Sequence, residues 1–216
     1  MARPVQQLLI LGARTFAVEV ADLVSEIPGF RLSGFVENME PERCREPLEG
    51  LPVIWVEDVA DMAHSHWAVC ALGTTHRSRF IEQAAEYGIP FATLVHPSAR
   101  ISSKSSLGEG TIVSAGVIIA ARTQVGRHVL VNRGALIGHH TEIGDYCTIG
   151  PGANIAASCR IGQATYIGMG AVVLDHISIG SHSVVGAGAV VTKDVPDHVQ
   201  VVGVPAKIVK EDIQGK

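Results

Sequence analysis

Residues 137–172 read IGHHTE IGDYCT IGPGAN IAASCR IGQATY IGMGAV, and this stretch decides the fold of the chain. An isoleucine stands at every sixth position, and a glycine follows it in five of these six hexads. The spacing continues on both sides without interruption, with Ile, Val or Leu at Ile101, Leu107, Val113, Ile119, Val125, Val131, Ile137, Ile143, Ile149, Ile155, Ile161, Ile167, Val173, Ile179, Val185 and Val191. A period of six fits neither an α-helix nor an alternating strand.

The repeat predicts a triangular prism in which each hexad supplies one short strand and one corner. The aliphatic residue points inward, and the following glycine suits a sharp turn or a close approach of two backbones. Four residues after each aliphatic residue stands a mostly small or β-branched one, such as Thr111, Ala135 or Thr141. Three hexads form one coil, so the sixteen hexads predict about five coils, each about 4.8 Å from the next.

The first hundred residues follow another pattern, in which apolar strand-like runs alternate with helical periodicity. The predicted strands are residues 7–11, 32–36, 53–55, 68–72 and 92–95, and the predicted helices are residues 16–26 and 77–87. In the first helix, Phe16, Val20 and Leu23 share a face. Alternating strands and helices predict a small α/β unit with a Rossmann-like parallel sheet.

The pattern changes to hexads after the sequence HPS at residues 96–98, so we predict domains of residues 1–97 and 98–216. The tail after Val191 contains Pro196 and Pro205. We expect it to add a strand and a short helix that close the last coil.

Composition and charge exclude several classes of function. Lys and Arg total 17 against 21 Asp and Glu, for a net charge of −4 without a basic patch, so we expect no nucleic-acid partner. The apolar run at residues 8–11 is too short for a secretory signal or a membrane span, and we expect a cytoplasmic protein without a membrane partner. Cys44, Cys70, Cys147 and Cys159 form no CxxC pair, and the last two fall on the small-residue position of the repeat, where we expect buried side chains.

The order of motifs along the chain resembles the bacterial sugar acyltransferases typified by sialic-acid O-acetyltransferase and the amino-sugar N-acetyltransferases of bacillosamine-type pathways. The motifs are LILGA (9–13) with Glu19 and Val20, GFVEN (34–38), ALG (71–73), TLVHPSA (93–99), IGHHTEIGD (137–145) and VGVPAK (202–207). This resemblance implies a left-handed parallel β-helix that works as a homotrimer, with active sites between subunits. It also implies acetyl-CoA as co-substrate on the β-helix and a nucleotide-linked sugar on the N-terminal domain.

The same resemblance implies roles for individual residues. A histidine that matches His139 serves as general base toward an incoming amine or hydroxyl, a task that suits imidazole near neutral pH, and His140 stands beside it. Backbone N–H groups at the glycine-rich corners can hold the oxyanion. The acyl-CoA and oxyanion positions are Asn132, Gly152, Ala157 and Gly168, and the acceptor positions are Gly12, Arg14, Glu37, Asn38, Gly73 and Thr148.

The chain departs from the family pattern at four places. His140 replaces the Asp or Glu that usually follows the catalytic histidine, and Thr148 replaces a second histidine near the acceptor. Ala157 replaces a glycine near the thioester. The first loop, residues 12–17, keeps one glycine where relatives have several, and Arg14 is its candidate for a phosphate contact.

Two other interpretations stay open at this point. A trimer that has lost its activity could act as a scaffold or ligand sensor, and an active enzyme could use a free sugar, a sialic acid or an amino acid as acceptor. A metal site is not expected. The β-helix carbonic anhydrases combine an upstream histidine with two histidines five residues apart, and no two of the ten histidines here differ by five.

Overall fold

The computed structural model describes residues 5–216, which form two compact units. The N-terminal unit runs to Gly73 and continues from Arg77 to Leu94, whereas residues 74–76 and the chain from Val95 onward belong to the C-terminal unit. The division between Leu94 and Val95 lies close to the predicted boundary near residue 97. None of the helices in the described residues is long and apolar enough to cross a membrane.

The N-terminal unit is a four-stranded parallel sheet in the order β3-β2-β1-β4, with short helices between its strands. Its elements are β1 (Gln6–Leu11), α1 (Thr15–Ser25), β2 (Phe30–Glu37), η1 (Pro41–Arg45), β3 (Val53–Trp55), η2 (Val56–Met62), β4 (His66–Cys70) and, after the 3-10 turn η3 (Thr75–Arg77), α2 (Ser78–Glu86). The central strand β1 is buried on both faces, as expected for a parallel sheet covered on both sides. The α/β class and four of the five predicted strands are confirmed.

Two details of the N-terminal prediction are wrong. Helix α1 buries Ala17, Val20 and Val24, while Phe16 and Leu23 are only half-buried, so its buried face is rotated from the predicted one. The predicted strand at residues 92–95 is not a fifth strand of this sheet, although the N–H of Ala92 donates to Ala68 of β4 (2.9 Å). Its last two residues form β5 (Leu94–Val95), which pairs with β8 at the start of the second sheet system.

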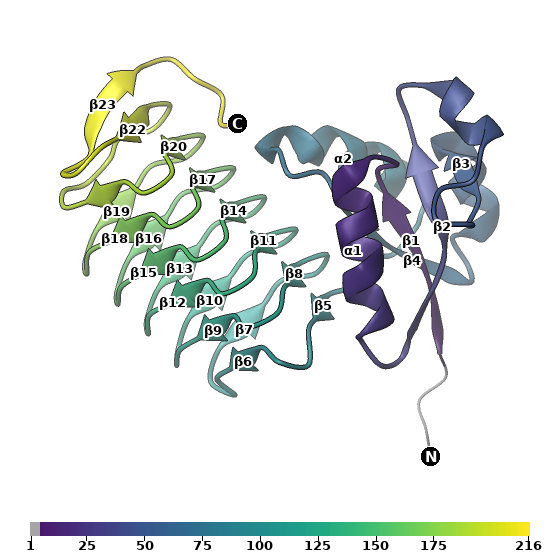
Figure 1. Ribbon diagram of the computed structural model, residues 1–216, viewed down its shortest axis with the longest axis horizontal. Coiled ribbons are helices and arrows are strands. Elements are labelled where there is room, and N and C mark those ends of the chain that lie inside the picture. Colours follow the sequence, from purple (N-terminus) through teal and green to yellow (C-terminus); the bar gives the residue numbers. More distant parts are fainter. Residues whose placement is uncertain (1–4) are drawn as a thin grey trace. The chain divides into compact units, whose positions relative to one another are not determined.

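The C-terminal unit is the predicted left-handed parallel β-helix, built from three sheets of two-residue strands (Figure 1). The six-stranded sheet contains β6 (Arg100–Ile101), β9 (Ile118–Ile119), β12 (Leu136–Ile137), β15 (Asn154–Ile155), β18 (Val172–Val173) and β21 (Val190–Val191). The five-stranded sheet contains β7 (Ser106–Leu107), β10 (Gln124–Val125), β13 (Glu142–Ile143), β16 (Arg160–Ile161) and β19 (Ser178–Ile179). The eight-stranded sheet contains β5, β8 (Ile112–Val113), β11 (Leu130–Val131), β14 (Thr148–Ile149), β17 (Tyr166–Ile167), β20 (Val184–Val185), β22 (Gln200–Val202) and β23 (Lys207–Lys210).

The inward aliphatic residues form one continuous core along the axis of the β-helix. Those from Val113 to Val191 are at most 4 % exposed, because each one stacks on its equivalents in the coils before and after it. The small residues four positions later are buried as well. Thr111 shows how a polar side chain fits there: its hydroxyl donates to the carbonyl of Gly126 (2.9 Å) and accepts the N–H of Val129 (3.2 Å) on the next coil.

The sequence suggests two explanations for the glycine that follows the aliphatic residue: a close approach of two backbones or a sharp turn. In the structure these two features occur at different positions of the hexad. A Cβ on the glycine that follows the aliphatic residue would lie within 3 Å of backbone or side-chain atoms one coil further on, for example 2.7 Å from the nitrogen of Gln163 at Gly144. The positive φ angles occur two residues later, at Gly152 (64°) but also at His140 (57°) and Ala164 (52°). The repeat therefore tolerates several residue types at its turns.

The tail closes the β-helix differently from the prediction. Strand β22 extends the eight-stranded sheet, and β23 returns antiparallel to it. No helix follows Val191 in the described chain, so the predicted terminal helix is wrong. Strand β23 closes the β-helix in its place, because it pairs with β22 and covers the edge of that strand.

A glycine directly follows every strand of the five-stranded sheet, at the position where two backbones approach closely. We therefore expect glycine to be indispensable there. We expect Gly144→Ala to lower the free energy of unfolding by about 3 kcal/mol, since its Cβ forces two backbones apart. Gly188→Ala is the matched control: φ is 66°, nothing lies within 4 Å of the new Cβ, and the cost should be about 1 kcal/mol. Equal melting temperatures for both variants at one protein concentration would contradict this account.

Candidate functional site

His139 and His140 lie in a turn at one edge of the triangular prism, between the six-stranded and five-stranded sheets. We call the stack of turns along this edge the His139 corner; it comprises residues 121–122, 139–140, 157–158 and 175–176. Backbone bonds set its spacing, because His140 N–H donates to Ala121 (3.0 Å) and Ser158 N–H donates to His139 (2.9 Å). Both imidazoles are exposed. A reacting molecule can therefore reach the rings from solvent.

The two imidazole rings contact each other. Nδ1 of His139 lies 2.9 Å from Nδ1 of His140, a hydrogen-bond distance, and the ring planes are almost perpendicular. Because a neutral imidazole has one N–H and one lone pair, one of the two rings donates and the other accepts. The structure thus brings together the two residues that the sequence selected as catalytic.

The backbone N–H groups proposed for an oxyanion differ in availability. Gly152 N–H donates to Arg133 (3.0 Å), and Gly168 N–H donates to Val185 (2.8 Å), so both N–H groups already have acceptors in this structure. They belong to the hydrogen-bond ladder between coils. Within residues 5–216, Ala157 N–H has no hydrogen-bond acceptor, and Ala157 lies in the His139 corner one coil after His139.

The remaining candidates on the β-helix lie away from the His139 corner. Asn132 and Gly152 are at the edge between the eight-stranded and six-stranded sheets, and the side-chain amide of Asn132 donates to the Ile149 carbonyl (2.9 Å). Gly168 ends a strand that leads to this same edge. Thr148 is buried on the eight-stranded face, which lies opposite the His139 corner in the triangular cross-section. One copy of the β-helix therefore does not gather these residues around His139.

In the N-terminal unit, the candidate acceptor residues follow three neighbouring strands. Gly12 follows β1, Glu37 and Asn38 end β2, and Gly73 comes after β4. The carboxyl ends of parallel strands meet at one edge of a sheet, and the strand order reverses between β1 and β4, where open α/β sheets bind ligands. The strand order therefore brings these candidate residues to one edge of the sheet.

Two of these residues serve the backbone of the edge itself. Gly12 has φ of 117°, which favours glycine, and its N–H donates to Val36 (2.8 Å). The buried carboxylate of Glu37 accepts the N–H groups of Asn38 (2.9 Å) and Met39 (2.8 Å). These contacts shape the loops, and the side-chain amide of the half-buried Asn38 donates to Gln83 (2.8 Å).

Arg14 belongs to a charged cluster that the sequence analysis missed in part. Glu40 accepts hydrogen bonds from Arg14 and from Arg43 (2.7 Å), so one carboxylate bridges two guanidinium groups. The bonds from Arg43 and then Arg14 lower the pKa of Glu40. Glu40 and Arg43 lie in a charged loop that is distant from Arg14 in sequence, and only the parallel pairing of β1 and β2 indicates that they meet.

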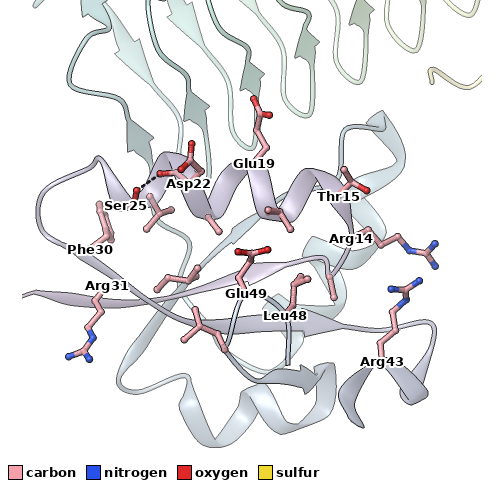
Figure 2. Close-up of a pocket in the computed structure, with 16 residues that line it drawn as sticks. Arg14, Thr15, Glu19, Asp22, Ser25, Phe30, Arg31, Arg43, Leu48 and Glu49 are labelled. Atoms are coloured by element: carbon pink, nitrogen blue, oxygen red, sulfur yellow. Dashed lines mark hydrogen bonds between the residues drawn. The ribbon is translucent and has the colours of Figure 1, made fainter. Parts of the chain in front are cut away.

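A cavity of about 1160 Å³ adjoins this cluster. In Figure 2, α1 runs along one side of it, Arg14 and Arg43 lie at one end, and Phe30 and Arg31 lie at the other. Its walls combine aliphatic side chains such as Val18 with these charged groups. The N-terminal unit thus has a hollow with two guanidinium groups at one end and a third at the other.

The described residues offer little support for metal-dependent or thiol chemistry. They include no group of three His, Cys, Asp or Glu that could hold a metal ion. Burial raises the pKa of the Cys70 thiol to about 11 and also raises the pKa of Cys159, so neither is a ready thiolate nucleophile. The predicted burial of Cys147 and Cys159 is confirmed.

Comparison with known proteins identifies the repeat and the whole architecture. The family model for the bacterial transferase hexapeptide (six repeats) matches residues 122–157 and 158–193. No curated protein matches the sequence. Among solved structures, PerB from Caulobacter crescentus in complex with CoA and GDP-perosamine is 30% identical, with 95% of this chain and 98% of that chain covered and a TM-score of 0.86.

Two further matches come from other bacteria. The acetyltransferase domain of PglB from Neisseria gonorrhoeae in complex with acetyl coenzyme A is 28% identical, covers 94% of this chain and 99% of that chain, and has a TM-score of 0.86. WeeI from Acinetobacter baumannii is 27% identical, covers 94% and 100%, and has a TM-score of 0.85. Structures of the Caulobacter perosamine N-acetyltransferase also match as variants in which one histidine is replaced by asparagine or alanine.

The cluster of Arg14, Glu40 and Arg43 should bind anions more tightly when its carboxylate is neutralised. We expect Glu40→Gln to raise the affinity for inorganic pyrophosphate about tenfold at low salt, because two guanidinium groups lose their internal counter-ion. Isothermal titration calorimetry measures this, and Glu42→Gln, in the same loop without a described ion pair, is the control. Unchanged affinity in Glu40→Gln would show that the cluster is not an anion site.

Proposed function

Because this chain belongs to the sugar acyltransferases of the hexapeptide-repeat superfamily, we propose that it transfers the acetyl group of acetyl-CoA to an amino group of a nucleotide-linked sugar. The observation that carries the proposal is the match to PerB, solved with CoA and GDP-perosamine, over 95% of this chain and 98% of that one. Free sugars, sialic acids and hydroxyl acceptors are the alternatives for the acceptor. The acetyl-CoA-dependent relatives favour an enzyme over a scaffold without activity.

The N-terminal unit binds the nucleotide part of the acceptor at the carboxyl edge of its sheet. Arg14 and Arg43 hold the diphosphate, since planar guanidinium groups pair with phosphate oxygens and Glu40 can release them. The first turn of α1 begins directly after Arg14, and its N–H groups favour an anion as well. Asn38 and Gly73, at the same edge, contact the rest of the nucleotide.

His139 acts as the general base. Acetyl-CoA is an activated thioester, so the enzyme mainly has to remove a proton from the acceptor and stabilise the oxyanion. The attacking nitrogen bonds to the carbonyl carbon while its proton moves to Nε2 of His139.

Ala157 N–H is the oxyanion donor that the β-helix offers near this base. It has no acceptor within the described chain, and it lies one coil from His139, about 4.8 Å along the axis. A fixed donor at the developing negative charge stabilises the tetrahedral intermediate. Its collapse breaks the C–S bond, and the thiolate of CoA takes the proton from His139.

The active unit is a homotrimer in which neighbouring subunits complete each site. This is supported by the position of Asn132, Gly152 and Thr148 on other sides of the prism from His139. A second subunit must present its own edge or face to the His139 corner if these residues act together. Closed threefold symmetry then gives three equivalent sites.

Replacement of the base gives the first test. We expect His139→Ala to lower kcat by about 10²- to 10⁴-fold, because a positioned base contributes this much to proton transfer. Thiol release from acetyl-CoA is measured with UDP-, GDP- and dTDP-linked amino sugars, free amino sugars and sialic acid. His182→Ala, a turn histidine on another corner of the β-helix, should keep wild-type activity.

Two outcomes of this panel contradict the proposal. Equal turnover of free and nucleotide-linked sugars removes the assignment of a nucleotide-linked acceptor. Wild-type turnover by His139→Ala removes the assignment of the base.

Mixing of two inactive variants tests the shared site. If each site uses His139 of one subunit and Asn132 of its neighbour, trimers reassembled from equal amounts of His139→Ala and Asn132→Ala should recover about a quarter of wild-type activity, because random assembly pairs two intact residues at one site in four. The unmixed variants are the controls. No recovery after mixing would mean that both residues act within one subunit.

A further inference from the structure

His140 stands in direct contact with the proposed base, and it carries no negative charge to orient that base. We propose that His140 is a positioning residue: its neutral Nδ1 accepts the Nδ1–H of His139 and thereby keeps the lone pair of His139 on Nε2. This inference rests on the proposed function of His139 as base. It deepens that proposal, because it assigns the proton on each ring nitrogen of the pair.

The geometry fits a hydrogen bond between the two Nδ1 atoms that lies on the line joining the ring centres. The two Nδ1 atoms are 2.9 Å apart, and the ring centroids are 5.0 Å apart at an interplanar angle of 87°. Because a ring nitrogen lies about 1.1 Å from the centre of an imidazole ring, an in-line bond of this length predicts a centroid separation of about 5.1 Å. The lone pair of one Nδ1 therefore faces the other Nδ1.

No carboxylate competes with His140 for this role in the part of the chain that the structure describes. Glu142, two residues on, has its carboxylate 3.7 Å from Arg160. Asp175 is in the same corner two coils away, about 10 Å along the axis. The group one coil before the pair is Arg122, a cation, which cannot accept an N–H.

The two possible arrangements of the proton differ in their chemical use. If His139 donates, its Nε2 is unprotonated and can take the proton of the acceptor amine, while His140 keeps its own proton on Nε2. If His140 donates, the Nε2 of His139 already carries a proton and cannot act as base. After transfer His139 is an imidazolium that still donates through Nδ1, and it returns the Nε2 proton to the leaving thiolate, so both rings end as they began.

The backbone allows this role to be tested with closely matched variants. His140 has φ of 57°, a conformation that asparagine tolerates well and that alanine adopts at Ala164 (52°), in the same position of another hexad. The Oδ1 of asparagine is as many bonds from the main chain as the Nδ1 of histidine. His140→Asn therefore keeps an acceptor at the same place, whereas His140→Ala removes it.

The first readout is the tautomer of His139, observed by long-range ¹H–¹⁵N correlation in the intact protein labelled with ¹⁵N-histidine, with His139→Ala to assign the signals. We expect the Nδ1–H tautomer in wild type and in His140→Asn, and a shift toward the Nε2–H tautomer in His140→Ala. An Nε2–H tautomer in wild type overturns the proposal. This measurement needs no acceptor, so its failure is distinct from failure of the proposed function.

The second readout is turnover with the acceptor identified by the panel. We expect His140→Ala to lower kcat about 10- to 100-fold with KM for acetyl-CoA unchanged, as for other outer-shell partners of a functional histidine. His140→Asn should restore kcat to within about threefold of wild type. Full activity of His140→Ala, or an equal loss in His140→Asn, would show that the acceptor atom at this position does not position the base.

Discussion

The hydrogen-bond ladder between coils is the constraint on which the rest of this molecule depends. Each coil returns after eighteen residues, so that a backbone N–H such as that of Gly138 meets the carbonyl of Ile155 at 2.8 Å. Glycines after the aliphatic residues let adjoining backbones come this close. Because the ladder fixes the rise per coil, it also fixes the columns of turn residues. His139 and Ala157 lie on one such column, and their spacing follows from the ladder rather than from contacts between their side chains.

The sequence predicts the β-helix almost residue by residue, and it does so because the period of six has one structural explanation. Val113 to Val191 are buried where the period requires it. The N-terminal unit is predicted less well, since its strands are recognised by composition alone. Residues 92–95 have the apolar character of a strand, but only pairing decides which sheet receives them, and β5 joins the β-helix.

The candidate site, too, is predicted from the sequence where it depends on the repeat and not where it depends on tertiary contacts. The position of His139 in a turn follows from the repeat, and so does the stacking of Ala157 above it. The hydrogen bond that Gly152 N–H already donates does not follow from residue type, because it depends on which side of a turn faces the next coil. Arg43 and Glu40 were missed for another reason: they meet Arg14 only through the packing of two neighbouring strands. Sequence distance hides such contacts.

A neutral histidine beside the proposed base would suffice because of the reaction that we propose. A carboxylate partner would both orient the base and stabilise its positive charge, and the second task matters most where water is excluded. The contact between the two rings supplies the first of these tasks, which is orientation of the proposed base. The thioester needs no further activation, which lowers the demand on the strength of the base. The departure at His140 is therefore compatible with our proposal that His139 is the base, and with the enzyme that the rest of the fold indicates.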